Sequence, residues 1–567
     1  MKKFLTLTIV ALVALIALST NVNAAETTVS TWADLKTALE GTEYDTIILE
    51  NSVTVSTEET LDLNGKTLIL NQKLVVDGDG LTITGNGKIT SSVASDLIVV
   101  KQGSSLIVEN GILENTAYDN GVVRIEGNPT DTDEKTTLTV KADAKLRGNY
   151  CIYIPSSGGF GVVINVYGTL EAITDNNGYN EGSIGISVNG TLQSTTGNVP
   201  EIYIHDGAVI TTEEGKTDDV NDDDAPAIYA AGYAIWNISG GSITGSEALS
   251  IKAGKFNITG GTFAGNGKYV NPATPEGSGS EATGSAISIT ANSGYSKNVE
   301  MKISNAEVTS ENGFAISEST TLGVGTAVNS IEVTSGDFSG KEGAVFVANT
   351  DEIGKFVTGG TFSSSVVEFI DTNSGLTNKE EDGINYVGIL HTVTGVDTEY
   401  GKVIPNKTEA VKGQTIKLEV ETKDGYRLKN LVVVDGPESF SIDITDSKTF
   451  VMPDVNVTLI AIFEEIPAEP ENPGSDEPTT PVEPGNPDSE EPIVPEEPGN
   501  SGAMGETEQE PSDDKESDKE TNISEDLKEE GKDDTPTTGS VDIVVYTSAI
   551  IAAVALTGIV IVKKYTK

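Results

Sequence analysis

The stretch Trp236-Asn237-Ile238-Ser239-Gly240-Gly241-Ser242-Ile243 recurs as Phe256-Asn257-Ile258-Thr259-Gly260-Gly261-Thr262-Phe263, with Gly240 and Gly260 twenty residues apart. In both copies apolar and polar residues alternate, then two glycines follow, and then a second short apolar strand begins. Alternation of this kind is typical of strands with one buried face. Glycine suits the corner between the strands because it tolerates a positive φ. The pattern predicts two short strands joined by a tight turn.

The same pattern occurs from Leu81 to Phe362. Further copies are Leu81–Ile89, Leu106–Leu113, Ile202–Val209, Ile331–Phe338 and Phe356–Phe362. Most copies have another small apolar strand nearby, across a loop of variable length: Ala227–Tyr229, Ala248–Ile251, Ala286–Ile289, Ala315–Ile316 and Ala344–Val347. The repeating unit is therefore two or three short strands.

A unit of about twenty residues cannot bury its apolar face alone. Stacking one unit on the next gives each strand parallel neighbours about 4.8 Å away and creates a continuous aliphatic interior. The sequence therefore predicts an all-β fold with a parallel β-helix, or solenoid. A row of β-sandwich modules is the alternative, but it would show longer strands and a period near 100 residues.

This arrangement resembles the right-handed, pectate-lyase-like β-helix of bacterial surface proteins, over about Thr31 to Ile370. We assign residues 25–372 to this domain. Trp32, Leu35 and Leu39 have helical spacing after an N-cap candidate at Ser30 or Thr31. We expect this short helix to cover the open end of the coil, where unpaired strand edges would otherwise invite aggregation.

The resemblance also raises an enzymatic alternative, because many β-helices are polysaccharide lyases or glycoside hydrolases. Such enzymes use basic residues with calcium-binding carboxylates, or paired acids with His and Arg. The chain has only three arginines and two histidines: Arg124, Arg147, Arg427, His205 and His391. The sequence identifies no positioned acid and base, and we name no catalytic residue. Cys151 lies in an apolar run, where we expect a core residue rather than a nucleophile.

One acidic cluster is a weak calcium candidate: Asp218, Asp219, Asp222, Asp223 and Asp224. Carboxylate oxygens are ligands that calcium prefers. The simpler interpretation is a solvated acidic insertion, so we predict no cofactor.

A separate unit is expected at residues 384–464, after a linker at Asn373 to Asp382. Alternation is nearly strict in Thr415–Val420 and in Val455–Phe463, which predicts strands. The unit resembles the divergent internalin-type B repeat, a small β-grasp-like module of Gram-positive surface proteins. That resemblance implies a spacer or a weak binding unit.

Residues 465–534 read as a disordered, Pro- and Glu-rich stalk. From Glu464 to Asp534 there are 26 acidic residues and four lysines. Such a segment cannot bury enough apolar area to offset its ordering entropy. The whole chain carries a net charge of −51, which argues against nucleic acid and anionic lipid as partners.

Both ends of the chain predict export. Lys2 and Lys3 precede an apolar run, and cleavage between Ala24 and Ala25 would remove residues 1–24 as a signal peptide. A second membrane span is the alternative. A single cysteine fits secretion, since it forms no internal disulfide.

The last segment, residues 535–567, resembles the cell-wall sorting signal of sortase substrates. It has a motif at 535–539, an uncharged run at 543–562 long enough to span a bilayer, and a basic tail at 563–567. The motif reads Thr535, Pro536, Thr537, Thr538, Gly539, with Thr in place of the family's leading Leu. The resemblance implies cleavage between Thr538 and Gly539 and attachment to peptidoglycan. A plain single-pass anchor is the alternative.

Together these features predict a wall-anchored surface protein whose β-helix binds a host glycan or surface protein without catalysis. Membrane contact would be through the C-terminal anchor only. We expect loops such as Lys216 to Asp224 and Tyr269 to Ser285 to add ligand contacts.

Overall fold

The computed structural model describes residues 25–117, 120–130, 133–156, 159–173, 183–192, 194–213, 225–273, 283–291, 298–320, 326–435 and 441–468. The predicted signal peptide, sorting motif, membrane span and Asp218–Asp224 cluster lie outside these residues, as do residues 469–534 of the predicted stalk. Within them, no helix is long and apolar enough to cross a membrane.

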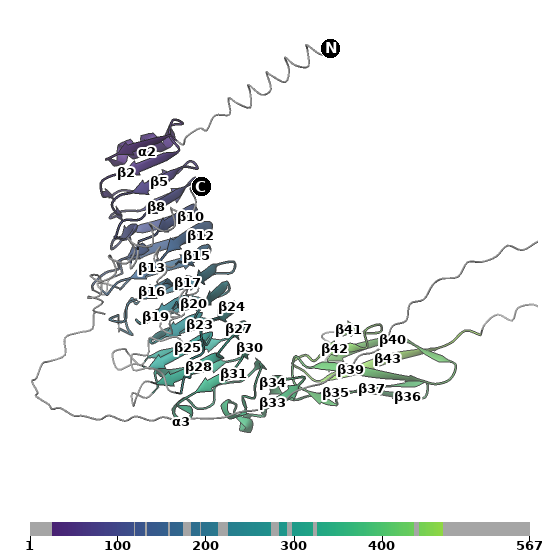
Figure 1. The fold of residues 1–567 in the computed structure, drawn as a ribbon. Coiled ribbons are helices and arrows are strands. Elements are labelled where there is room, and N and C mark those ends of the chain that lie inside the picture. Colours follow the sequence, from purple (N-terminus) through teal and green to yellow (C-terminus); the bar gives the residue numbers. More distant parts are fainter. Residues whose placement is uncertain are drawn as a thin grey trace, which may run out of the picture. The chain divides into compact units, whose positions relative to one another are not determined.

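The predicted parallel β-helix is confirmed, and each of its coils has three faces (Figure 1). The first face contains β1 (Glu26–Val29), β2 (Thr46–Leu49), β5 (Thr67–Leu70), β8 (Lys88–Ser91), the second halves of β10 (Ser105–Asn115) and β12 (Thr136–Gly148), β15 (Thr169–Ala172), β18 (Val209–Thr212), β21 (Ser242–Gly245), β24 (Thr262–Gly265), β27 (Ala306–Ser310), β30 (Gly336–Gly340) and β32 (Gly360–Phe362). Each strand pairs in parallel with the equivalent strand of the next coil, as in Ile47 with Leu68.

The second face is a separate sheet of eleven strands in the described part of the chain. It contains β3 (Val53–Val55), β6 (Leu74–Val76), β9 (Ile98–Val100), β11 (Gly121–Ile125), β13 (Tyr150–Ile154), β16 (Ile184–Val188), β19 (Ile228–Ala230), β22 (Leu249–Ile251), β25 (Ile287–Ala291), β28 (Phe314–Thr320) and β31 (Gly343–Val347). The small apolar strands noted between the repeats all belong to this face.

The third face returns the chain to the next coil. It contains β4 (Glu59–Asp62), β7 (Leu81–Thr84), the first halves of β10 and β12, β14 (Val162–Val166), β17 (Glu201–Ile204), β20 (Ile235–Ile238), β23 (Gly254–Ile258), β26 (Val299–Ile303) and β29 (Val328–Val333). The glycine-rich turn of the repeat joins the third face to the first face of the next coil, and we call it the tight corner. At Gly240 an added Cβ would lie 2.7 Å from Asp206 Cα in the coil before, so this corner stacks too closely on the preceding one for a side chain.

One continuous aliphatic core fills the interior of the coil. Inward residues of successive coils lie in register, so identical kinds of side chain stack. Trp236 pairs with Phe256, and their rings stack with centroids 5.7 Å apart and planes 3° apart. Phe338 and Phe362 stack in the same way at 5.0 Å. Cys151 is fully buried, as expected, and burial raises the pKa of its thiol well above the ordinary range.

The predicted N-terminal helix is α2 (Trp32–Glu40), and it covers the first coil as expected (Figure 1). Thr31 caps it by accepting a hydrogen bond from the Asp34 backbone N–H, and Leu35 and Leu39 point into the core. Lys66, almost fully buried, donates from Nζ to the carbonyls of Ala38 and Leu39 at the other end of the helix. These charged hydrogen bonds satisfy carbonyls that a helix C-terminus leaves without partners.

The C-terminal end of the coil corrects the predicted domain boundary. After the short helices α3 (Thr350–Ile353), η1 (Val367–Phe369) and η2 (Thr372–Ser374), strands β33 (Leu376–Glu381) and β34 (Ile384–Ile389) form an antiparallel hairpin. β34 pairs with β32 of the coil, and Val387 joins the coil's core. The linker interpretation of residues 373–382 was therefore wrong, and residues 384–389 pack on the coil.

Residues from 391 onward form two further sheets. One has the order β38 (Glu409–Ala410), β35 (His391–Thr394), β43 (Val457–Glu465), β40 (Tyr426–Asp435), β41 (Ser441–Asp443), and the other β36 (Val396–Thr398), β37 (Gly401–Pro405), β39 (Thr415–Thr422), β42 (Thr449–Val451). The two predicted strands correspond to β39 and β43. Between His391 and Glu465 the described residues contain strands and no helix, so the β-grasp likeness is not shown.

Candidate binding surface

From β12 onward, the tight corner places one side chain of each coil in a single column. The residue that follows the third-face strand in each coil occupies this position, because Val166, Ile204, Ile238 and Ile258 are in register. We call this series the corner column: Lys141, Tyr167, His205, Ser239, Thr259, Ser304, Thr334 and Thr358.

The later part of the corner column is a ladder of hydroxyl groups. Each side chain donates to a backbone carbonyl of the preceding coil: Ser239 to Ile204, Thr259 to Ile238, Ser304 to Ile258, Thr334 to Ile303 and Thr358 to Val333, at 3.2–3.4 Å. These hydroxyls reinforce the stacking of coils, and this part of the column is structural.

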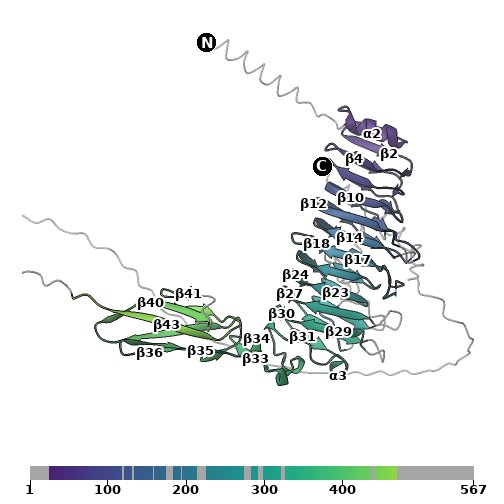
Figure 2. The same cartoon turned by 180° about the vertical axis from the view of Figure 1, so that it is seen from behind.

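The middle of the corner column is aromatic. Tyr167 and His205 stack with ring centroids 3.9 Å apart and planes only 5° apart. Figure 2 shows the strands that directly precede them, β14 and β17, side by side on consecutive coils. Lys141 Nζ lies 5.7 Å from the centre of the Tyr167 ring, in a cation–π contact. A half-buried aromatic stack thus lies at the edge of the third face.

Polar groups hold this stack in place. His205 Nε2 lies 3.0 Å from Asn165 Oδ1, and the Tyr203 hydroxyl donates to Glu201 at 2.6 Å. Asn165 and Tyr203 are register partners, with outward side chains on adjacent strands. The hydrogen bond to Glu201, together with burial, raises the pKa of Tyr203, so the phenol stays protonated at neutral pH. We call Lys141, Asn165, Tyr167, Glu201, Tyr203 and His205 the aromatic cluster.

A titration of His205 tests this geometry. Burial lowers the pKa of His205 below its ordinary value of 6.5, so the folded protein favours the neutral imidazole. The contribution of neutral His205 to the free energy of unfolding should be fully present above pH 6.5. It should be lost as the pH falls through the lower pKa of the folded state. We expect NMR titration to give His205 a pKa below 6.5, with His205→Asn identifying its resonance against that of His391. A pKa at or above 6.5 would contradict the half-buried stack.

The first face carries a different feature, a ladder of ion pairs. Arg147 pairs with Glu114 at 2.9 Å and with Glu171 at 2.8 Å, and Lys88 and Lys145 pair with the same two carboxylates. Burial opposes ionisation of Glu114 and Glu171, but the bound cations outweigh it and lower the pKa of both. A glycoside hydrolase needs one carboxylic acid that keeps its proton. These paired carboxylates do not supply one, so the ladder is suited to joining coils.

The structure places the remaining sequence candidates as follows. Arg124 pairs with Glu126 at 2.9 Å and lies over the Tyr153 ring on the second face. His391 contacts Asp454 at 3.0 Å outside the coil. Arg427 pairs with Glu464. In the described part of the chain no group of three or more His, Cys, Asp or Glu is arranged to hold a metal ion.

The sequence showed no partner for His205, whose ring stacks on Tyr167 in the structure. Sequence reasoning missed Tyr167 because Val162–Leu170 was not counted among the repeats, although Val162-Val163-Ile164-Asn165-Val166-Tyr167-Gly168 has the same alternation before a glycine. Counting the residue after each third-face strand would have found the corner column.

Two segments are similar to known domain families. Residues 26–143 match a pectate lyase-like adhesive domain, and residues 391–467 match the divergent InlB B-repeat domain. No curated protein and no solved structure matches the chain. The two domain matches indicate an extracellular surface protein of the adhesion type, and the first family is described as adhesive rather than catalytic. This favours a role other than catalysis. The second match begins after β34, in agreement with the corrected boundary.

Proposed function

We propose that this protein is a cell-wall-anchored adhesin whose coil binds a host glycan, or a glycosylated surface protein, through the aromatic cluster. The observation that supports this most is the Tyr167–His205 stack, half-exposed on a regular face and bordered by an amide and a carboxylate. Tyrosine combines a rigid apolar ring with a polar hydroxyl, which suits a ligand with both kinds of surface.

Sugar rings present that combination. Their C–H faces pack on aromatic rings, while their hydroxyls bond to groups such as Asn165 and Glu201 at the ring edge. The rigid third face holds these groups without a further folding cost, because each strand is fixed by a parallel neighbour on both sides. Binding without cleavage is part of the proposal, and the match to a family described as adhesive supports it.

The proposal extends to the termini. The signal peptide would deliver the chain across the membrane, and sortase would join Thr538 to peptidoglycan. The acidic stalk would then hold the coil away from the wall.

A glycan array probed with the full chain tests the binding surface. We expect Tyr167→Ala and His205→Ala each to weaken binding to the best glycan at least tenfold, since each removes one of the two stacked rings; this loss is about 1.4 kcal/mol. Ser304→Ala is the matched control, because it lies in the same column four coils from Tyr167 and should bind normally.

A second assay addresses the enzymatic alternative. The same glycans are incubated with the protein, and reducing and unsaturated ends are measured over time. Release of either kind of end would overturn the non-catalytic proposal. Unchanged glycan binding by Tyr167→Ala and His205→Ala would show that the aromatic cluster is not the binding site.

A further inference from the structure

A groove follows the tight corner of the later coils, parallel to the coil axis. Its volume is about 940 Å³, within the size range of ligand sites. Six consecutive corners contribute to its lining: Gly207, Gly240, Gly261, Asn305, Ser335 and Gly359. With about 4.8 Å per coil, the groove extends about 24 Å, so it is too long for one sugar ring and suits a chain of several.

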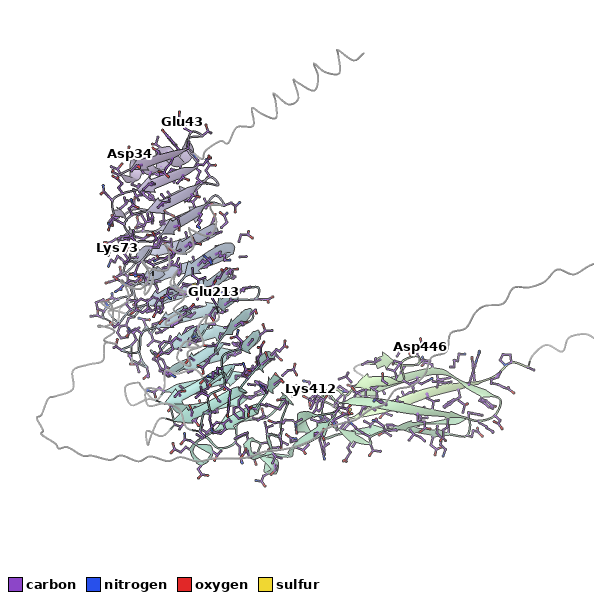
Figure 3. All side chains as sticks on the ribbon, viewed as in Figure 1. Asp34, Glu43, Lys73, Glu213, Lys412 and Asp446 are labelled. Carbon is purple, nitrogen blue, oxygen red and sulfur yellow. The ribbon has the colours of Figure 1, made fainter. Side chains whose placement is uncertain are left out.

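The groove begins beside the aromatic cluster. Gly207 lies two positions after His205, and Glu213, at the other end of β18, marks this part of the coil in Figure 3. Three members of the corner column also line the groove: Ser239, Thr334 and Thr358. His205 and Tyr167 belong to the same column, so the aromatic stack and the groove lie on one line. A ligand that packs on the two rings can therefore continue into the groove.

The floor of the groove is bare backbone. At Gly261 an added Cβ would lie 3.0 Å from the carbonyl oxygen of Gly240 in the preceding coil. At Gly360 it would lie 2.9 Å from the carbonyl oxygen of Gly336. These close approaches leave no room for a side chain at either corner, which keeps the corner hollow.

The sides of the groove carry hydroxyl groups. Ser239, Thr334 and Thr358 donate their hydrogens to carbonyls of the preceding coil, so their oxygens keep lone pairs that can accept hydrogen bonds from a ligand. On the other side, one outward residue of each first-face strand lines the groove: Val209, Ser242, Thr262, Glu307, Asp337 and Thr361. No apolar side chain that the described coils contribute to this lining is larger than valine. The groove therefore offers hydrogen bonds rather than apolar side-chain pockets.

The charge of the groove is negative. Its coil residues Asp206, Glu307 and Asp337 are exposed acids. The other two charged residues of the lining, Lys412 and Asp454, have opposite signs and pair with each other at 3.9 Å. A carboxylated or sulfated sugar would be repelled by the three acids, whereas the same carboxylates can accept hydrogen bonds from the hydroxyls of an uncharged sugar.

We infer that the groove binds an unbranched, uncharged oligosaccharide that runs along the coil axis from the aromatic cluster. This inference rests on the proposed function and makes it more specific, because it gives the length, direction and charge of the ligand. An extended peptide would also lie along the groove, but its side chains would find no apolar pockets on the coil.

Calorimetry on the full chain with two lengths of sugar tests the inference. The probes are the hexasaccharide and the disaccharide of β-1,4-linked N-acetylglucosamine, which are uncharged and carry hydroxyls along their whole length. We expect the hexasaccharide to bind at least tenfold more tightly, because only the longer chain fills the groove. A hexasaccharide that does not bind, or that binds no more tightly than the disaccharide, would overturn the inference.

Gly207→Asn places a side chain in the groove. Gly207 has a φ of +82°, which asparagine tolerates better than most residues, and an added Cβ meets no atom within 4 Å. We expect this variant to weaken hexasaccharide binding at least fivefold and to leave disaccharide binding unchanged.

Gly65→Asn is the matched control variant. Gly65 has a φ of +76° and equally open surroundings, and it lies two residues before β5 as Gly207 lies two residues before β18. It does not line the groove, so this variant should bind both sugars normally. If Gly207→Asn bound the hexasaccharide as tightly as Gly65→Asn, the inference would be wrong.

An acidic sugar tests the charge of the ligand. A hexasaccharide of alternating glucuronic acid and N-acetylglucosamine should bind at least tenfold more weakly than the uncharged hexasaccharide, and the difference should narrow as salt rises. Glu307→Gln combined with Asp337→Asn should narrow the difference at least threefold. Equal binding of the two hexasaccharides by the unaltered protein would contradict the inference. Tighter binding of hexaglycine than of the uncharged hexasaccharide would also contradict it and would indicate a peptide site.

Tyr167→Ala separates this inference from the proposed function. It should weaken binding of both uncharged sugars by the same factor, because the disaccharide already contacts the rings. If the variant weakened disaccharide binding but the hexasaccharide had no advantage, the groove alone would be refuted. If the hexasaccharide kept its advantage and Tyr167→Ala changed neither affinity, the aromatic cluster alone would be refuted.

Discussion

Replacing Trp236 by alanine should lower the free energy of unfolding of the coil by about 3–5 kcal/mol. Trp236 is fully buried and stacks on Phe256 of the next coil, so its removal leaves a cavity between coils that the rigid strands close only in part. Neighbouring coils stabilise one another, and the damage should therefore extend beyond one turn. Urea denaturation followed by far-UV circular dichroism measures the loss.

Trp236→Phe is the informative control. Among the described residues the indole Nε1 has no hydrogen-bond partner, and phenylalanine already occupies the same position one coil later. We expect this variant to lose less than about 1.5 kcal/mol, because the ring stack is kept and no hydrogen bond is lost. If Trp236→Ala were as mild as Trp236→Phe, stacking between coils would not be a main source of stability.

Replacing Pro536 and Thr538 by alanine should remove the protein from the cell wall. On the proposed sortase reaction, Thr538 is the residue joined to peptidoglycan, so wall extracts should lose nearly all of it. The protein would appear instead in the medium or the membrane fraction. Fractionation and immunoblotting of wall, membrane and medium measure this.

Thr537→Ala is the control for that experiment, because the matching position of the sorting motif accepts any residue. It should leave wall attachment unchanged. Normal attachment of the Pro536 and Thr538 variant would eliminate the sortase interpretation and leave a plain membrane anchor.

The repeat could be found from the sequence because the two strands around the tight corner are close in the chain. In Trp236–Ile243 and Phe256–Phe263 two adjacent glycines follow the alternating apolar and polar residues at the same distance. The strands of the second face were recognisable but had no fixed spacing, since loops of different lengths precede them. The helix at Trp32 was found because its cap and apolar spacing are local.

Two features depended on contacts between distant residues. The hairpin at residues 376–389 contains Lys379, Glu380 and Glu381, which read as linker, yet β32 offers an edge on which it pairs. Tyr167 and His205 are 38 positions apart, and only the register of Asn165 with Tyr203 shows that they are neighbours. A sequence pattern shows how apolar and polar residues alternate along one strand. The hairpin and the aromatic cluster depend instead on the register between strands of neighbouring coils.

Each end of the coil is closed by an element that is not itself a coil: α2 covers the first turn, and the antiparallel hairpin ends the parallel sheet after β32. Coils can therefore be added or removed between these two elements without exposing a new edge. Each in-frame duplication would lengthen the protein by about 4.8 Å and repeat one strip of its surface. Evolution can thus adjust the length of the coil, and the number of contacts that its surface can make, one turn at a time.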